Sequence, residues 1–482
     1  MTEITKAEIT EAEITNRVGR RIRPLDILHL RGNRLFADSG HGVSVMPPAP
    51  SVFSGAIRSR ILVEEGVSFE DVASGRIAEG PVRAVLGGGP DDPGSFRIRW
   101  SGLDVEGLDV EGLDVEGLDV EGLDVEGHAP KSGQGKSPSP APGVYLPAPG
   151  DLVFEEGPAA EGADRGPLRV HRLVPRSLAS IPGVRIGSAA PGVPFLQCPR
   201  RFKPATGVWI HVEAYRRHLA GEGVEAGDCA RSGDLWKRDD RLGITLDPAH
   251  RSAAKGLLYT SEAIALAPGV SFRVEIAGGG SLVPESGFLR LGGDARAAAI
   301  ETVPSNEDPL EVPVPGGDRF RMILVTPGLF PDGWLPPGTR LEANRILWSI
   351  GGLTAELEAA SVSRHEVVSG WDLVAGGPKP AQRSVPAGSV TWWRWTGTTG
   401  GTGAVDVAAR RAALAPLVEH GLWPLLKDVL SDEDPAVRRL WSARRAEGFN
   451  NVRFGTGESP DRALDTVASA AGNEAAPAAR ED

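Results

Sequence analysis

Apolar residues along the chain gather in many short runs, and most of these runs suit strands better than helices. Strands are predicted at 21–32, at 270–278, and as two neighbouring runs within 241–266. A further strand is predicted at 288–293, where FLRLGG ends in a pair of glycines that indicates a turn. This part of the chain is therefore expected to form a sheet.

Helical patterns are fewer. The segment PPAPSVFSGAIRSRILVEEG (47–66) predicts a Pro-rich loop and then a helix that is capped by Ser51 and ends at Gly66. A second set of elements follows: FRMILVTPGLF at 320–330, SVTWWRW at 389–395, a helical stretch at 404–446 and GFNNVRFGTG at 448–457. Two α+β units in tandem, each a sheet with helices on one face, fit this order best.

The length of 482 residues allows two or three domains with a sizeable core. We assign an acidic low-complexity leader to 1–16 and the first unit to 17–305. The second unit is assigned to 306–482, with a helical insertion and a disordered C-terminal tail.

Five tandem LDVEG units at 103–127 interrupt the first unit and lead into a Pro/Gly/Ser-rich linker. A Gly at every fifth residue suits neither the helix period nor strand alternation. We therefore predict a disordered insertion over 101–143. Calcium binding by Asp104, Glu106 and their repeats is the alternative, although calcium repeats usually place Asp and Gly closer together in a tight turn.

The formal net charge of −12 is unevenly distributed. The repeats hold ten carboxylates and the segment through Glu13 a further net three negative charges, so the rest of the chain sums to about +1. Local basic surfaces are therefore possible, whereas attraction of nucleic acid by the whole molecule is not expected.

The chain contains only Cys198 and Cys229, and neither belongs to a Cys/His cluster. This excludes a disulfide framework and a structural zinc site and indicates a reducing, cytoplasmic setting. The first twenty residues lack a cationic start with an apolar stretch, and no apolar run reaches eighteen residues. We therefore expect neither export nor a membrane partner, and we predict no metal or other cofactor.

Several stretches, taken in order, resemble one family. They are PLDILHLRGNRLF, MPPAPSVFSGAIRSRIL, DDRLGITLDPAHRSAAKGLLYTSEAI, FLRLGGDARAAAIE, MILVTPGLFPDGWLP, VVSGWDLVAGGPKPAQRSVPAGSVTWWRW and GFNNVRFGTG. The chain is similar to the RAMP proteins of CRISPR systems, and specifically to the third subunit of the type III-B Cmr effector complex. The acidic leader and the insertion have no counterpart in the family pattern.

The resemblance implies two tandem ferredoxin-like (RRM-type) domains and no catalytic activity. It also implies a place in antiviral defence at the five-prime handle of the crRNA, between the large polymerase-like subunit and the backbone RAMP subunit. RRM-type sheets usually stack RNA bases on aromatic side chains. Because this chain has only three Tyr and lacks the aromatic RNP signature, loop and backbone contacts are the better expectation.

Three segments supply most of the candidate RNA contacts: the 47–66 helix, the basic run at 236–256, and the glycine-rich 448–457. Polar helix faces and flexible glycine turns suit phosphate. The candidates, with one from the turn after 288–293, are Ser54, Arg58, Arg60, Arg238, Arg241, His250, Lys255, Arg296, Gly448, Asn451, Arg453, Gly455 and Gly457. The competing interpretations are a solvated helix face, Arg–Asp pairs within the basic run, and an ordinary strand-connecting turn.

Two further functions stay open. A metal-independent crRNA endonuclease of the same superfamily would use His29 or His250 as general acid or base, but the sequence identifies no positioned partner for either. A pure scaffold would touch only protein.

Two other motifs invite a chemical interpretation. Strand alternation sets Trp393 and Trp395 opposite Trp392 and Arg394, so one Trp face is expected in the core and the other could stack a base or meet a partner. Asp294 follows Gly-Gly as a metal-binding carboxylate can, but no second acidic motif pairs with it. We interpret the glycines as a turn.

Overall fold

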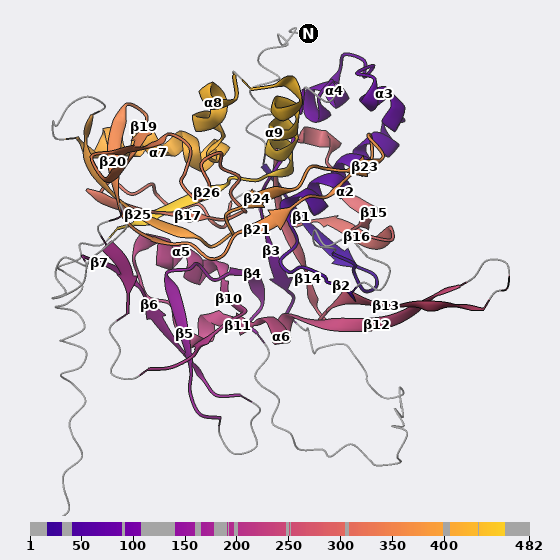
Figure 1. Ribbon diagram of the computed structural model, residues 1–482, viewed down its shortest axis with the longest axis horizontal. Coiled ribbons are helices and arrows are strands. Elements are labelled where there is room, and N and C mark those ends of the chain that lie inside the picture. The colour runs from indigo at the N-terminus through magenta and orange to yellow at the C-terminus, as the bar shows by residue number, and fades with distance from the viewer. Residues whose placement is uncertain are drawn as a thin grey trace, which may run out of the picture.

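The structure is a computed structural model that describes residues 17–30, 41–88, 92–107, 140–159, 165–177, 190, 192–196, 201–246, 250, 252–303, 308–398, 405–431 and 433–457. Predictions for the leader 1–16, the C-terminal tail 458–482 and the segment 108–139 lie outside these residues. The described residues form a mixed α/β fold with several antiparallel sheets (Figure 1).

The N-terminal half is built on an eight-stranded sheet in which all neighbours are antiparallel. Its strands, in spatial order, are β11 (Cys229–Arg231), β10 (Val208–His211), β4 (Gly143–Pro147), β3 (Arg97–Val105), β14 (Val270–Ala277), β1 (Arg17–Pro24), β16 (Arg296–Thr302) and β15 (Ser286–Leu291). The C-terminal half contains a six-stranded antiparallel sheet. Its order is β18 (Thr339–Glu342), β19 (Arg345–Ile350), β20 (Leu353–Ser361), β25 (Val390–Thr398), β17 (Arg319–Leu324) and β26 (Val452–Thr456).

Smaller sheets surround these two. A hairpin of β12 (Trp236–Leu246) and β13 (Ala253–Leu266), joined by β2 (His41–Gly42), extends from the body on the right of Figure 1. The others are β6 (Leu168–Arg172) with β5 (Leu152–Glu156) and β9 (Pro204–Ala205), β7 (Val174–Ser177) with β8 (Gly192–Phe195), β21 (Glu366–Val368) with β24 (Gln382–Ser384), and β22 (Trp371–Asp372) with β23 (Gly377–Pro378).

The helices among the described residues are α2 (Pro50–Glu64), α3 (Phe69–Ala73), α4 (Pro81–Leu86), α5 (Val212–Ala220), α6 (Ser232–Leu235), α7 (Val407–His420), α8 (Lys427–Ser431) and α9 (Pro435–Glu447). The predicted helix at 47–66 is confirmed as α2, but its cap differs. Pro50 occupies the first turn after Ala49, so Ser51 lies inside the helix and caps nothing. The positive φ of 67° at Gly66 ends it as expected.

The predicted insertion at 101–143 begins too early. Ser101–Val105 completes β3, where Leu103 pairs with Phe272 and is fully buried. Asp104, from the first LDVEG unit, accepts an ion pair from Arg21 at 2.9 Å. Neighbouring strands override the five-residue period because they supply both a hydrogen-bonding edge and an apolar pocket for Leu103.

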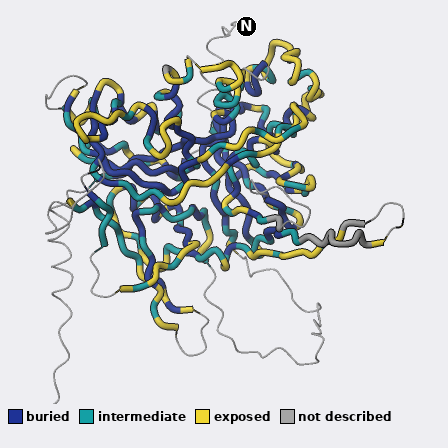
Figure 2. Tube along the Cα trace, viewed as in Figure 1, coloured by how far each residue is buried: buried dark blue, intermediate teal, exposed yellow. Residues whose placement is uncertain are grey.

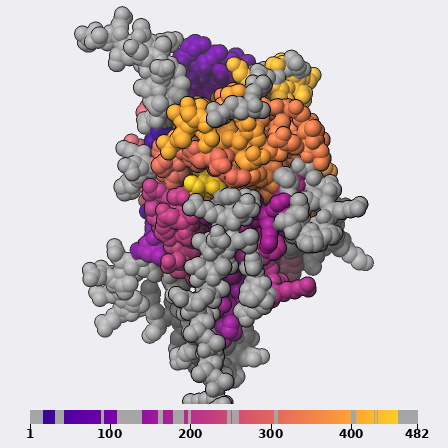
Figure 3. Space-filling view, turned by 90° about the vertical axis from the view of Figure 1, so that its left-hand side faces the viewer, coloured from indigo at the N-terminus to yellow at the C-terminus, as the bar shows by residue number. Residues whose placement is uncertain are grey.

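The two halves share a core. One apolar cluster combines Trp100 and Ile210 from the N-terminal half with Ile323, Val390 and Trp392 from the C-terminal half. Figure 2 shows this dark, buried band between the exposed outer elements, and Figure 3 shows the orange C-terminal half lying directly against the magenta segments. The relative placement of the two sheets therefore rests on apolar burial.

Buried charges add to that contact. Asp151, just before β5, forms an ion pair with Arg321 of β17. Nε2 of His218 on α5 lies 2.9 Å from the Asp151 carboxylate. All three side chains have an exposed fraction of 0%. Burial opposes the charged carboxylate, but His218 and Arg321 outweigh it and hold the pKa of Asp151 below its usual range.

Candidate nucleic-acid interface

The β12–β13 hairpin carries exposed cations on a narrow two-stranded arm. The side chain of Arg238 is 62% exposed and contacts Glu262 at 3.3 Å, and that of Arg241 is 53% exposed and contacts Asp239 at 2.9 Å. The Arg241–Asp239 pair is exposed on both sides and contributes little to folding, whereas Glu262 is buried. Both guanidinium groups are more than half exposed and can therefore reach phosphate. Of the Arg–Asp pairs predicted within the basic run, Arg241–Asp239 is present, whereas Arg238 pairs with Glu262 of β13, and both cations stay at the surface.

The far end of the hairpin holds the two other candidates from the basic run. His250 lies exposed in the connection between the strands, and Lys255 lies within β13. The side chain of Lys255 is outside the described residues. Beside the cations, Leu242 and Ile244 expose 66% and 50% of their surface, which makes the arm amphipathic.

The base of the hairpin meets the turn between β15 and β16. Leu28 bridges to Ile264 of β13, and His29 bridges to Gly293 of the turn. His29 is only 5% exposed, and its ring nitrogens lie 3.4 Å from the Ser261 hydroxyl and 3.6 Å from the Asp294 carboxylate. The histidine therefore connects the hairpin to the large sheet.

The sequence prediction of a turn at Gly292–Gly293 is confirmed. Gly292, Asp294 and Ala295 have φ values of 72°, 57° and 49°, which close the β15–β16 hairpin in the left-handed region. A Cβ on Gly292 would lie 2.8 Å from the carbonyl oxygen of His29, so this position also requires glycine for space. Arg296, just after the turn, pairs with Asp26 at 2.9 Å and keeps 29% of its side chain exposed.

The candidates on α2 are largely corrected by the structure. Ser54 is fully buried and donates to the carbonyl of Ala446 in α9, so it cannot reach RNA. Arg58 donates to the carbonyls of Leu86 and Pro93 and lies over the Phe96 ring, and its burial lowers the pKa to about 10. The two side chains are held by different neighbours: α9 covers Ser54, whereas Arg58 is half-buried and is bound by carbonyls at the end of α4 and before β3.

Arg60 is the exception on this helix. Its side chain is 32% exposed and forms an i,i+4 pair with Glu64 at 2.6 Å. Arg58 is partly exposed as well but is held by two backbone carbonyls, whereas this surface pair is the one hydrogen bond of the Arg60 side chain among the described residues.

The glycine-rich segment 448–457 is a helix end and a strand, and the prediction of a phosphate-binding loop is wrong. Gly448 ends α9 with a φ of 93°, and a Cβ there would lie 2.3 Å from the Ile98 carbonyl oxygen. The buried amide of Asn451 donates to the carbonyls of Ile98 and Gly448. These groups fasten α9 to β3.

The remaining residues of that segment lie in or beside β26. Arg453 is 1% exposed and donates to Asp308 at 2.5 Å. Gly455 lies beneath α5, where a Cβ would come within 2.9 Å of the Leu219 carbonyl oxygen, and the amide of Gly457 donates to Arg319. Gly455 and Gly457 therefore allow the strand to pack closely against its neighbours.

The tryptophans of β25 alternate as predicted but offer no surface. Trp393 and Trp395 belong to the core of the C-terminal sheet, and Trp392 to the core shared between the halves. Each is at most 6% exposed. Core packing therefore holds for all three tryptophans, and the alternative that Trp392 stacks a base or meets a partner is excluded because the N-terminal half covers it.

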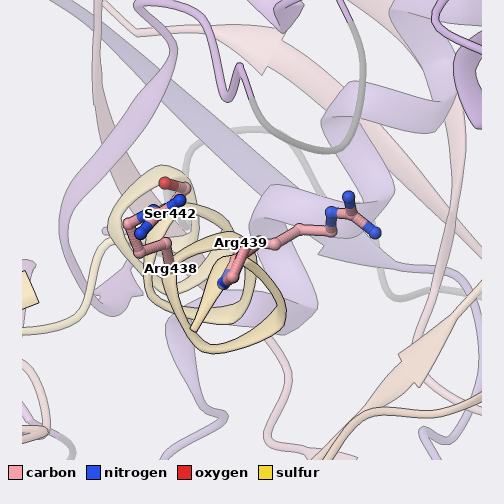
Figure 4. A pocket seen from close by; sticks show the side chains of 4 residues that line it. Arg438, Arg439 and Ser442 are labelled. Carbon is pink, nitrogen blue, oxygen red and sulfur yellow. The ribbon is translucent and has the colours of Figure 1, made fainter. Parts of the chain in front are cut away.

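A pocket of about 290 Å³ lies on α9, lined by Pro435, Arg438, Arg439 and Ser442. Figure 4 shows Arg438 and Ser442 on one side of the helix and Arg439 directed away from them. Arg438 is also committed to the carbonyls of Ser431 and Glu433. The lining side chains do not converge on one ligand position.

Sequence reasoning missed Phe288 and Arg290. Both are exposed on β15, whereas Leu289 and Leu291 between and beside them are buried. The alternation in FLRL carries this signal, since period-two strands place every second side chain on the outer face.

Metal and membrane features are absent from the part of the chain that the structure describes. No group of three His, Cys, Asp or Glu side chains could hold a metal ion there, and no helix there is long and apolar enough to cross a membrane. Burial raises the pKa of the Cys229 thiol to about 12, so this cysteine stays protonated.

Comparison with known proteins identifies the class as CRISPR-associated. The family model described as "CRISPR-associated protein (Cas_Cmr3)" matches residues 20–404. Because this match covers well over half of the 482 residues, the chain belongs to that family, and the resemblance predicted from the sequence is confirmed. No curated protein sequence matches the chain.

Two solved structures contain similar chains. One is described as "Cryo-EM structure of the Type III-B Cmr-beta bound to cognate target RNA", with 12% identity, coverage of 90% of this chain and 96% of that chain, and a TM-score of 0.40. The other is the same complex with "cognate target RNA and AMPPnP, state 1", with 12% identity, 90% and 95% coverage and a TM-score of 0.38.

Proposed function

We propose that this chain is a non-catalytic crRNA-binding subunit of a type III-B CRISPR effector complex. It caps the five-prime handle of the crRNA and bridges the large polymerase-like subunit to the backbone RAMP subunit, acting in the cytoplasm in antiviral defence. Membership of the family supports this class of function. The observation that carries RNA binding is the β12–β13 hairpin, which projects the exposed Arg238 and Arg241 away from the body of the molecule.

The strand orders support the ferredoxin-like part of the proposal. Numbered within each half, β3-β14-β1-β16 and β20-β25-β17-β26 both follow the order 2-3-1-4. In the first half α2 follows the first strand, and in the second α7 and α9 precede the last strand. Helices connecting strands in this order are typical of ferredoxin-like units.

The geometry of His29 supports a non-catalytic subunit over an endonuclease. A general base must come within hydrogen-bond reach of the RNA 2′-hydroxyl. His29 is 5% exposed, and both of its ring nitrogens face protein groups, Ser261 and Asp294. His250, exposed at the hairpin connection, is the better placed of the two for contact with RNA.

The test removes charge from the hairpin while keeping its shape. We expect the double variant Arg238→Gln/Arg241→Gln to bind crRNA more weakly. The slope of log affinity against log salt should become less steep by about 0.7 for each phosphate that the variant no longer neutralises. Arg340→Gln is the matched control, because Arg340 is 42% exposed in a comparable pair with Glu342 on β18. Binding is measured with the full chain and with the assembled complex at several salt concentrations.

An unchanged slope in the double variant would contradict the proposed RNA contact. The endonuclease is tested separately by incubating the chain with repeat RNA in EDTA. Cleavage that disappears in His29→Ala or His250→Ala would overturn the non-catalytic assignment. A complex without this subunit that still protects the handle and retains the large subunit would contradict the capping and bridging role.

A further inference from the structure

The outer edge of the eight-stranded sheet presents an uncovered aromatic side chain. Phe288 on β15 is 62% exposed, and Arg290, two residues later on the same face, is also exposed. Leu289 and Leu291 point to the opposite face, where they pack into the core together with Ile57 of α2. The exposed face is thus the side of the sheet that α2 does not cover.

The strand register explains why the Phe288 ring is uncovered. Phe288 lies opposite Ala299 of β16, which in turn lies opposite Arg23 of β1. Arg290 lies opposite Ala297. Because the two alanines project only a methyl group, they form a low floor beside the ring, and its flat side remains open.

The two arginines of this face differ in whether they form ion pairs. Arg23 is 47% exposed and is paired with Glu106 and Glu301. Arg290 is exposed and forms no ion pair or hydrogen bond with the side chains that the structure describes. Leu25 is 58% exposed and lies beside Ala297, because its backbone amide donates to the Ala297 carbonyl. We name Phe288, Arg290, Ala297, Ala299 and Leu25 the β15 platform.

The platform lies next to the base of the cationic hairpin. The backbone amide of Gly293, in the β15–β16 turn that follows Arg290, donates to the carbonyl of His29 at 2.8 Å, and the adjacent Leu28 exchanges backbone hydrogen bonds with Ile264 of β13. In Figure 1, β15 and β16 lie directly above the point where β12 and β13 leave the body. A strand of RNA that follows the hairpin toward the body would therefore reach the platform.

We propose that the β15 platform binds an unpaired base of single-stranded RNA, with the base stacked on Phe288 and the adjoining phosphate held by Arg290. This inference rests on the proposed RNA-binding function and adds a site to it. Every base has a face that stacks on an aromatic ring, and a nearby free guanidinium supplies the charge that a phosphate needs. A protein partner fits less well, because the apolar Phe288 and Leu25 are interleaved with Arg290 and Arg23 and do not form a continuous apolar patch.

The experiment uses the full-length chain and a single-stranded RNA that contains 5-iodouridine. We expect Phe288→Ala to weaken binding about 5- to 100-fold at constant salt, without changing the salt slope, because stacking releases no counterions. Phe288→Trp should retain the affinity, and Arg290→Gln should lower the slope by about 0.7. Photocrosslinking should label the peptide that contains Phe288.

Trp371→Ala is the control for loss of an exposed aromatic, since Trp371 is 60% exposed on β22. It should bind RNA like the unaltered chain, and all variants should keep its melting temperature. Unchanged affinity in Phe288→Ala, while Arg238→Gln/Arg241→Gln weakens binding, would overturn the platform and leave the proposed function standing. Loss of subunit assembly with unchanged RNA affinity would identify the face as a protein interface and overturn the platform as well. Failure of the unaltered chain to bind RNA would refute the proposed function itself.

Discussion

The arginines of this chain have the same guanidinium group but differ in how far it is buried. Arg453 and Arg99 are buried in the contact between the halves, where Asp308 lies 2.5 and 3.9 Å from their guanidinium groups. Arg238 and Arg241 keep more than half of their side chains in solvent. A buried guanidinium is retained by its paired carboxylate, whereas an exposed one can exchange its partner for phosphate.

Glu275 provides a test of the buried charges at the residue scale. It is 2% exposed, its Oε2 atom has no hydrogen-bond partner among the described residues, and burial together with the neighbouring Asp308 raises its pKa to about 7. A raised carboxyl pKa means that the folded protein holds its proton longer than the unfolded chain. The stability from this proton is complete below the usual pKa near 4.5 and is lost as pH rises through about 7.

We therefore expect Glu275→Gln to flatten the pH dependence of unfolding. The loss of unfolding free energy between pH 5 and pH 8 should be smaller in this variant by up to about 3 kcal/mol, and urea titrations at both pH values measure it. Glu342→Gln, whose parent side chain is 62% exposed, is the control. Equal pH dependence in Glu275→Gln and the unaltered chain would show that Glu275 is ionised in the fold.

At the scale of elements, β3 shows how a repeat can become a strand. The first LDVEG unit completes β3 with a buried Leu103, and Asp104 and Glu106 of the same unit pair with arginines of β1. The following units at 108–127 have the same sequence and lie outside the described residues. Sequence period alone therefore cannot distinguish the paired unit from its copies.

Two deletions separate these roles. Removal of 108–127 leaves one LDVEG directly after Gly102, so β3 and its partners are kept and the melting temperature should not change. Removal of 103–127 places His128 where Leu103 was, which should destabilise the fold by about 2–5 kcal/mol, as for other losses of a buried leucine. Thermal and urea unfolding measure both, and equal stability of the two deletions would show that β3 does not need this unit.

At the scale of the whole molecule, the two halves behave as one packed unit. Their shared apolar cluster joins β3, β10, β17 and β25, and the Asp151, His218 and Arg321 group lies within the same contact. The hairpin and the β15 platform belong to the N-terminal half, but α9 of the C-terminal half covers the α2 face. The unit boundary between 305 and 306 that was predicted from the sequence therefore does not separate independent surfaces.

We expect Asp151→Asn to destabilise the entire chain, because it leaves Arg321 buried without its carboxylate. The cost should be about 3–5 kcal/mol at pH 7, where the carboxylate with its lowered pKa is ionised and its contribution is fully present. Urea unfolding followed by tryptophan fluorescence and by circular dichroism should give one coincident transition at lower urea. Asp318→Asn, with a parent side chain that is 66% exposed, should cost less than about 1 kcal/mol. Two separate transitions would contradict the single packed unit.

The sequence by itself determined the family, the mixed α and β character, the strands within 241–266, 270–278 and 288–293, the helix α2, the turn at Gly292 and the alternation of the β25 tryptophans. These properties depend on local periodicity, on turn chemistry and on the order of motifs along the chain. They needed no knowledge of which elements meet.

Only the tertiary structure decided which cations and aromatics face solvent. Arg453 and Trp392 are covered by segments that lie far away in the sequence, whereas Phe288 is left open because its neighbours across the sheet are alanines. Burial is a property of pairs of elements, and the sequence of one element does not state what packs on it. The RNA contact that we propose is for the same reason decided by the fold, through the groups that packing leaves uncovered.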